Sequence, residues 1–164
     1  MEDARFEEAA ATDRPLRLRA EGADDLAVIS SLAQDAVAKV ADVSWAKGRR
    51  RLVALLNRFR WEDRPEAAID RRPPERVRSI LTIEQVESVQ ARGVDPSDAE
   101  TVVSILAIGF ETSDDPEDPS GVITLHLAGD GDVAIRVEAL EISLEDVSRP
   151  WLAPSGKPPY HGEA

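Results

Sequence analysis

Four arginines on two neighbouring predicted strands are the first residues whose chemistry the sequence singles out. Arg58 and Arg60 lie near the end of one alternating segment, and Arg76 and Arg78 begin the next. If these strands pair antiparallel through loop 62–75, we expect the four guanidiniums to share one face of the sheet. Like charges placed side by side cost energy unless an anion or a carboxylate lies among them.

This arginine face has two interpretations. One is a binding site for a phosphate, a nucleotide or an RNA backbone. The favoured one is a solvated face, because no aromatic residues interleave with the arginines to stack on bases. Three glutamates are placed to neutralise such a face: Glu62, Glu75 and Glu84.

Asn57 and Trp61 lie on the opposite face of the first strand and complete the set of candidate anion- or partner-binding residues. Asn57 stands between Leu55 and Phe59, and a buried amide there must be hydrogen-bonded. We predict a contact to the backbone of a loop or bulge, with a ligand contact as the alternative. Trp61 beside arginines is typical of a protein-binding surface.

Few other residues offer chemistry. The sequence has no cysteine and only two histidines, and His126 is expected to face solvent beside Thr124. The acidic segment 114–118 lacks the ligand spacing of a calcium loop and is interrupted by prolines. Phosphate-loop, dinucleotide, zinc-protease and nucleophile-elbow motifs are absent. We therefore predict no catalytic residue, no metal and no cofactor.

The elements that must position these residues are mainly strands. Asp24 or Asp25 is a suitable cap for a helix over residues 24–34. A Gly-Asp turn at 129–132 predicts a hairpin. Alternating segments predict strands at 16–20, 36–46, 51–61, 76–92, 102–111, 121–128 and 133–144. The alternation slips near Val40, near Glu84–Val86 and at Leu140, which indicates bulges or bends.

The fold class that follows is α+β, with one N-terminal helix. We expect a mainly antiparallel, strongly bent sheet or partly open barrel of six to seven strands. Residues 1–15 are expected to form a disordered acidic tail, residues 16–148 a single globular domain and residues 149–164 a Pro-rich tail. Trp151 is expected to pin the start of that tail to the domain.

Composition limits the location and the partners. The 164 residues carry a formal net charge of −12, and residues 83–164 hold 4 basic against 17 acidic residues. A chain this acidic repels nucleic acid and anionic membranes at long range. The acidic N-terminus is unlike a secretory signal, and no apolar run is long enough to span a membrane. We therefore expect a cytoplasmic protein that does not bind membranes.

Four blocks of sequence, taken in order, resemble a family from alphaproteobacteria known only as domain-of-unknown-function family 2948. The resemblance covers roughly residues 16–151. The blocks are Ser31–Val37, Leu56–Glu62, Leu106–Phe110 and Ile135–Glu141. The family implies a cytoplasmic bacterial protein and brings no activity, cofactor or catalytic residue.

Three functions stay open at this point. The favoured one is a non-enzymatic binding or accessory domain that engages another protein or a second copy of itself. The alternative is binding of RNA or a phosphorylated ligand through the arginine face, which the net charge makes less favoured. A hydrolytic enzyme is third, because carboxylates such as Asp35 and Glu62 are available but no motif brings them together.

Overall fold

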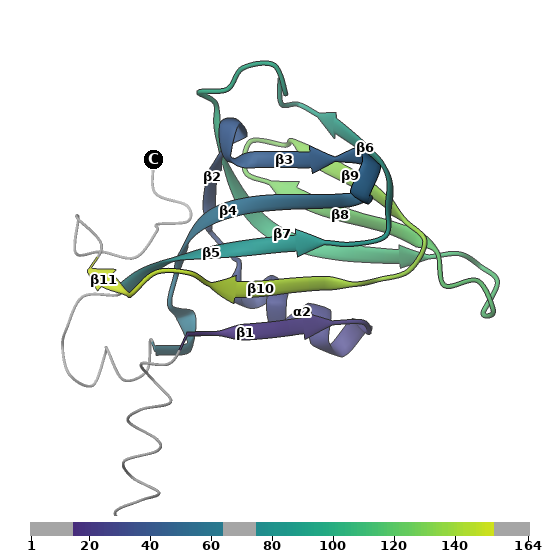
Figure 1. Ribbon diagram of the computed structural model, residues 1–164, viewed down its shortest axis with the longest axis horizontal. Helices are drawn as coiled ribbons and strands as arrows, with labels where there is room; N and C mark the ends of the chain where they lie inside the picture. Colours follow the sequence, from purple (N-terminus) through teal and green to yellow (C-terminus); the bar gives the residue numbers. More distant parts are fainter. Residues whose placement is uncertain (1–14, 64–74, 153–164) are drawn as a thin grey trace, which may run out of the picture.

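The computed structural model describes residues 15–63 and 75–152 and builds them around one antiparallel sheet (Figure 1). This part of the chain contains one α-helix, α2 (Ala23–Leu32), and eleven strands. The strands are β1 (Arg17–Ala20), β2 (Val37–Lys39), β3 (Val43–Ala46), β4 (Arg51–Phe59), β5 (Glu75–Ile83), β6 (Val86–Arg92), β7 (Val102–Thr112), β8 (Gly121–Leu127), β9 (Asp132–Val137), β10 (Ile142–Asp146) and β11 (Trp151–Leu152).

The strands follow the order β1-β10-β5-β4-β2-β7-β8-β9-β6, with β3 added beside β4 and β11 beside β5. Every pairing is antiparallel. The predicted α+β class with one helix and an antiparallel sheet is therefore confirmed. The prediction of six to seven strands is wrong, and the sheet is neither closed nor strongly curled, as a barrel would require.

The strand count differs because three segments predicted as single strands are each two strands, and because the predicted C-terminal tail contributes β11. A 3₁₀ turn over Val40–Asp42 separates β2 from β3. Gln85 has a left-handed backbone with φ of 60°, which ends β5 and begins β6 in a new direction. Residues 138–141 separate β9 from β10. Each break lies where the sequence alternation slips, so the slips mark strand ends and not bulges within continuous strands.

The buried face of β4 is the one that carries its even-numbered residues. Leu52, Ala54 and Leu56 are buried in the core, whereas Val53 and Leu55 are only half-buried on the outer face. Because successive side chains of a strand point to opposite faces, this assignment also places Arg58 on the core side and Asn57 on the outer side. The side of β4 that holds the arginines is therefore the interior one.

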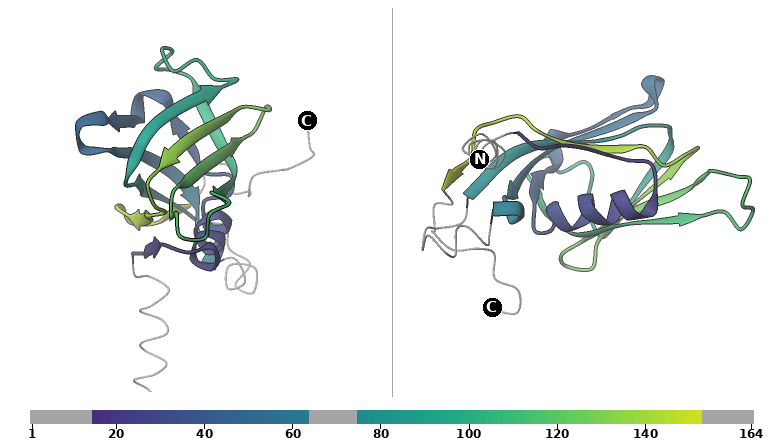
Figure 2. Two further views of the ribbon diagram at one scale, coloured as in Figure 1. Left: turned by 90° about the vertical axis from the view of Figure 1, so that its right-hand side faces the viewer. Right: turned by 90° about the horizontal axis from the view of Figure 1, so that it is seen from below.

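Helix α2 packs against β7 and β1, and Figure 2 shows it lying along one side of the sheet. Leu26 and Ile29 are its buried residues. The helix begins after Gly22, which makes no side-chain cap, so the predicted capping by an aspartate is wrong. Asp24 and Asp25 lie instead in the first turn, where carboxylates stabilise the positive end of the helix dipole.

The two predicted tails lie almost entirely outside the described residues. At the C-terminal end, Trp151 and Leu152 pair with Arg76 and Glu75 as β11 against β5. The predicted hairpin turn at 129–132 is confirmed: Gly129 and Asp130 have φ of 84° and 68°, and β8 pairs with β9 on either side of them.

Candidate functional site

The register of β4 and β5 places Arg76 and Arg78 on the opposite face of the sheet from Arg58, and Arg60 lies just beyond the end of β4. Asn57 lies opposite Arg78, and Phe59 lies opposite Arg76, so these four share the outer face. Arg58 lies opposite Val77 on the core face. The expectation that all four guanidiniums share one face is therefore wrong.

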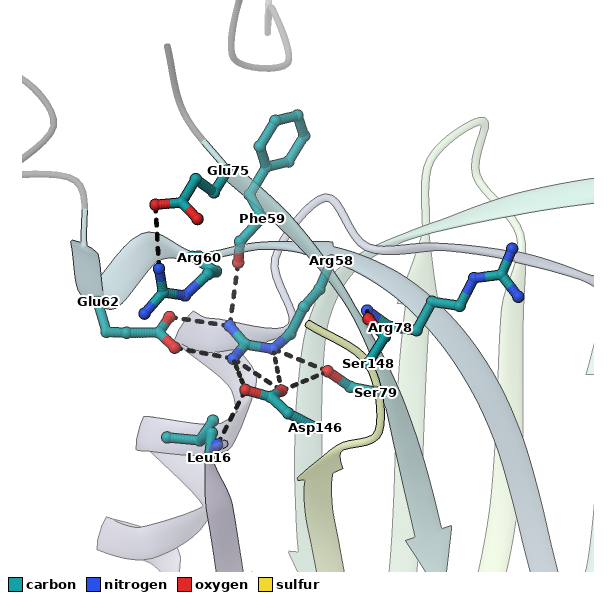
Figure 3. Close-up of polar contacts among 10 residues, drawn as sticks. All are labelled: Leu16, Arg58, Phe59, Arg60, Glu62, Glu75, Arg78, Ser79, Asp146 and Ser148. Carbon is teal, nitrogen blue, oxygen red and sulfur yellow. Dashed lines mark hydrogen bonds and ion pairs between the residues drawn. The ribbon is translucent and has the colours of Figure 1, made fainter. Parts of the chain in front are cut away.

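Arg58 is fully buried and every one of its N–H groups has an acceptor (Figure 3). Nε donates to Ser79 Oγ at 3.0 Å, and Nη1 donates to the Phe59 carbonyl at 3.0 Å. Glu62 accepts from Nη1 and Nη2 at 2.9 and 2.8 Å, and Asp146 accepts from Nη2 at 3.0 Å. No donor of Arg58 remains for an external anion.

Asp146 also accepts hydrogen bonds from Ser79 and from Leu16, so it connects the residues around Arg58 to the N-terminal part of the domain. Its Oδ1 accepts from Ser79 Oγ at 2.7 Å, and its Oδ2 accepts from the Leu16 N–H at 2.9 Å. The Asp146 N–H in turn donates to the Leu16 carbonyl at 2.8 Å. We call Arg58, Glu62, Ser79 and Asp146 the buried arginine cluster. It ties β4 to β5, β10 and the entry to β1.

Electrostatics keep the Arg58–Glu62 pair ionised. Burial lowers the pKa of Arg58, but the hydrogen bonds and charges of Glu62 and Asp146 outweigh burial and raise this pKa above its ordinary value. Burial likewise raises the pKa of Glu62, and the Arg58 guanidinium overcomes that effect and holds the pKa below its ordinary value. Arg58 and Glu62 therefore stay charged and hydrogen-bonded to each other.

Arg60 is also paired inside the protein. It is only 5% exposed, and its Nη1 lies 3.2 Å from Glu75 Oε1. Glu62 and Glu75 thus neutralise Arg58 and Arg60, although the two arginines are buried and not on a solvated face. Glu84, the third expected counter-ion, instead pairs with Arg51. Two of the four candidate arginines are therefore committed to internal carboxylates.

The outer face of β4 and β5 gathers the remaining candidates. The Arg76 guanidinium lies 4.0 Å from the centre of the Phe59 ring, and its Nη1 donates to Asn57 Oδ1 at 3.0 Å. Burial lowers the pKa of Arg76. Phe59 and Trp61 rings are 5.6 Å apart, and Trp61 Nε1 donates to the Gln34 carbonyl at 2.8 Å. Asn57 thus bonds a side chain and not the predicted loop backbone.

A groove of about 240 Å³ lies beside this cluster on the same face. Arg78, Lys39 and the acidic Asp42 line it together with apolar Val37, Leu55 and Val102, and we call it the outer groove. Arg78 is exposed, and within residues 15–63 and 75–152 no carboxylate forms an ion pair with its guanidinium. Figure 3 shows the Arg78 side chain pointing away from the buried arginine cluster. This groove combines cationic and apolar surface.

Two weaker candidates take ordinary surface roles. His126 is exposed, as expected. In the acidic loop, Asp115 Oδ1 accepts from the Glu117 N–H at 2.9 Å, and Asp118 Oδ1 accepts from the Ser120 N–H at 3.0 Å. These carboxylates shape the turn between β7 and β8. In the described parts of the chain, His, Asp and Glu side chains form no group of three that could hold a metal ion.

Comparisons with known proteins place the chain in a family without assigning it an activity. No curated protein and no solved structure gives a significant match. A family model does match, over residues 16–161, which includes both the buried arginine cluster and the outer groove. The chain therefore belongs to the family described as "Protein of unknown function (DUF2948)".

Proposed function

We propose that this chain is a non-enzymatic binding domain that engages a protein partner through the outer groove. The observation on which the proposal rests is the exposed Arg78, which has no ion-pair partner among the described residues, beside apolar side chains in one groove. Lys39 adds a second exposed cation, which pairs with Glu100 at 3.8 Å. Val102, at 58% exposure, extends the apolar part. Such a surface fits a peptide segment that carries both acidic and apolar side chains.

The neighbouring aromatic residues support this proposal. Arg and Trp are the residue types that contribute most to binding energy at interfaces. Trp61 and Trp151 are both partly exposed next to the strand end that carries Arg76. Trp61 directly follows the end of β4, and Trp151 lies on β11 beside β5, so both adjoin the strands whose residues line the outer groove. A partner seated over β4 and β5 would contact both.

The test is quantitative capture by the full-length protein from the lysate of its native cell. We expect Arg78→Glu and Val102→Asp to lose the captured proteins that the unaltered chain retains, with the thermal midpoint unchanged. Arg136→Glu is the matched control, because Arg136 is an exposed arginine on β9, outside the groove. Equal capture by all four proteins would contradict the proposal.

Binding of RNA or a phosphorylated ligand is the second candidate, and the outer groove supports it with fewer cationic residues than the sequence suggested. Arg58 and Arg60 are engaged with Glu62 and Glu75, so an anion would have Lys39, Arg78 and the Asn57 amide. This candidate predicts capture that nuclease treatment abolishes and an affinity that falls steeply with salt. A nuclease-treated half of each capture sample separates the two.

We further infer a cytoplasmic protein with one domain over residues 16–148. The absence of cysteine from the sequence supports the location, and the pairing of β1 with β10 supports the single unit. The described helix is too short to cross a membrane. Fractionation of the native cell with an antibody against the chain tests the location.

A further inference from the structure

A cavity of about 310 Å³ lies within the sheet and is distinct from the outer groove. Its floor is formed by buried side chains of β4, β5, β7 and β8, such as Leu56, Leu81, Ile105 and Leu125. Ala38 and Ala54 also line it, and these short side chains leave space that larger residues would fill. The volume falls in the range of small-molecule pockets, which begins at roughly 300 Å³.

The side chains that line this cavity are apolar except for one indole N–H, that of Trp45. The lining consists of Ala, Val, Leu, Ile and Pro side chains and a single tryptophan, Trp45. The space exceeds the roughly 10–15 Å³ that one water needs, yet a buried water requires two to four polar partners. Cavities lined in this way stay dry and accept apolar molecules. Left empty, the lining would forgo the dispersion contacts that a close-packed interior normally makes.

The cavity opens towards β3 and β6. Lining residues from these strands are partly exposed, in contrast to the floor: Val43 is 38% exposed, and Trp45, Val89 and Ala91 are half-buried. Within the described sheet β3 pairs only with β4, and β6 pairs only with β9 (Figure 1). Each strand therefore has one unpaired edge, so an entry path between them breaks no strand pairing.

We infer that this cavity is a binding site for an uncharged hydrocarbon group of a small molecule, such as an alkyl chain. The lining offers dispersion contacts and removal of apolar surface from water. It has no charged side chain, and the Trp45 indole N–H is its one polar side-chain group. A polar end of the molecule would remain at the mouth between β3 and β6. This site adjoins the outer groove, because Ala38 and Leu56 line both, but Arg78, Lys39 and Val102 line the groove alone.

The probe for this test is N-phenyl-1-naphthylamine, an uncharged fluorophore that brightens in apolar surroundings. Full-length protein, stripped of bound lipid on a hydrophobic resin, is titrated with the probe, and 1-dodecanol is then added as a competitor. We expect saturable binding of one probe per chain and displacement by 1-dodecanol. A lack of saturable binding overturns the inference, including the case in which a segment of the chain itself occupies the cavity.

Two cavity variants and a matched control locate the binding. Ala91→Leu narrows the mouth and Ala54→Leu fills the floor, and each should weaken probe binding by about tenfold or more. Ala134→Leu adds the same side chain on β9, next to the lining residue Val133 but on the opposite face. Equal weakening in the control, or none in both folded cavity variants, overturns the inference. Arg78→Glu should bind the probe normally, which separates this test from that of the outer groove.

Discussion

The core-facing side of β4 differs in packing and in chemistry between its two ends. At one end Leu52, Ala54 and Leu56 are apolar and leave a cavity. At the other end, on the same side of the same strand, Arg58 occupies its space completely and satisfies all its donors. The end of β4 that carries Arg58, which we call the charged end, is tightly packed. The end that carries Leu52, Ala54 and Leu56, which we call the apolar end, borders the cavity.

This difference follows from what each kind of group requires. A buried guanidinium is stable only if carboxylates and carbonyls surround it at fixed distances, so its neighbourhood has one arrangement. Apolar side chains have no such directional requirement, so a space between them can remain and admit different contents. We therefore expect the buried arginine cluster to fix the geometry of the domain and the cavity to be the part that adapts.

Removal of Arg58 should have the largest effect on stability. Arg58→Met leaves Asp146 and Glu62 without their counter-ion, and breaking a buried pair typically costs about 3–5 kcal/mol. Arg17→Met is the control, because its ion pair with Glu145 is exposed and should contribute about 0–1 kcal/mol. Urea unfolding followed by tryptophan fluorescence measures both. Equal losses in the two variants would show that the charged end is no more constrained than the surface.

Filling the apolar end should stabilise the protein by a smaller amount. Ala54→Leu adds dispersion contacts where space exists, which typically gains about 0.5–2 kcal/mol. Ala134→Leu, on the outer face of β9, should change the free energy of unfolding by less than about 0.5 kcal/mol. A loss of stability in Ala54→Leu alone would mean that the apolar end is already closed.

The Arg58–Glu62 pair at the charged end should make the stability of the protein depend on pH. Because Arg58 lowers the pKa of Glu62 in the folded state, the folded chain binds fewer protons than the unfolded chain. This contribution is fully present above the ordinary pKa of 4.5 and is lost as pH falls through the lower folded pKa. Glu62→Gln should flatten the acid decline of the urea midpoint. Glu84 beside Arg51 acts in the same direction, so Glu84→Gln is the comparison outside the buried arginine cluster.

Arg78 should have the smallest effect on stability. Its side chain is exposed and has no ion-pair partner among the described residues, so Arg78→Ala should change the free energy of unfolding by less than about 0.5 kcal/mol. Measured beside Arg58→Met, it contrasts arginines on the two faces of one strand pair. A loss of several kcal/mol would show that Arg78 also has a structural role.

Much of the fold could be predicted because its signals are local. The helix and the Gly129–Asp130 turn depend on residues close in sequence, and the structure has both. The slips in alternation near Val40 and Gln85 coincide with the ends of strands β2 and β5. A slip alone does not distinguish a bulge from a strand end, since pairing partners decide that, and the strand count was therefore too low.

The candidate site was harder to predict for the same reason. The burial of Arg58 depends on Asp146, which is 88 positions away, and nothing near Arg58 in the sequence reveals that partner. Asp146 lies just beyond the predicted end of the last strand, so the alternation assigns it to neither face of the sheet. The cavity was also not predicted, because empty space results from how side chains of many strands meet. The placement of the candidate arginines on two faces follows from the register in which β4 pairs with β5. The sequence of the loop between these strands does not determine that register.

The pairing of β1 with β10 and the contact of Asp146 with Leu16 have a consequence for how the protein is made. During synthesis at roughly 5–20 residues per second, Asp146 follows Arg58 by about 4–18 seconds. Until then β4 and β5 have no β10 beside them, and Arg58 lacks one of its two carboxylates. The sheet can therefore be completed only after β10 has been synthesised, so the synthesis of the C-terminal strands determines when the domain can finish folding.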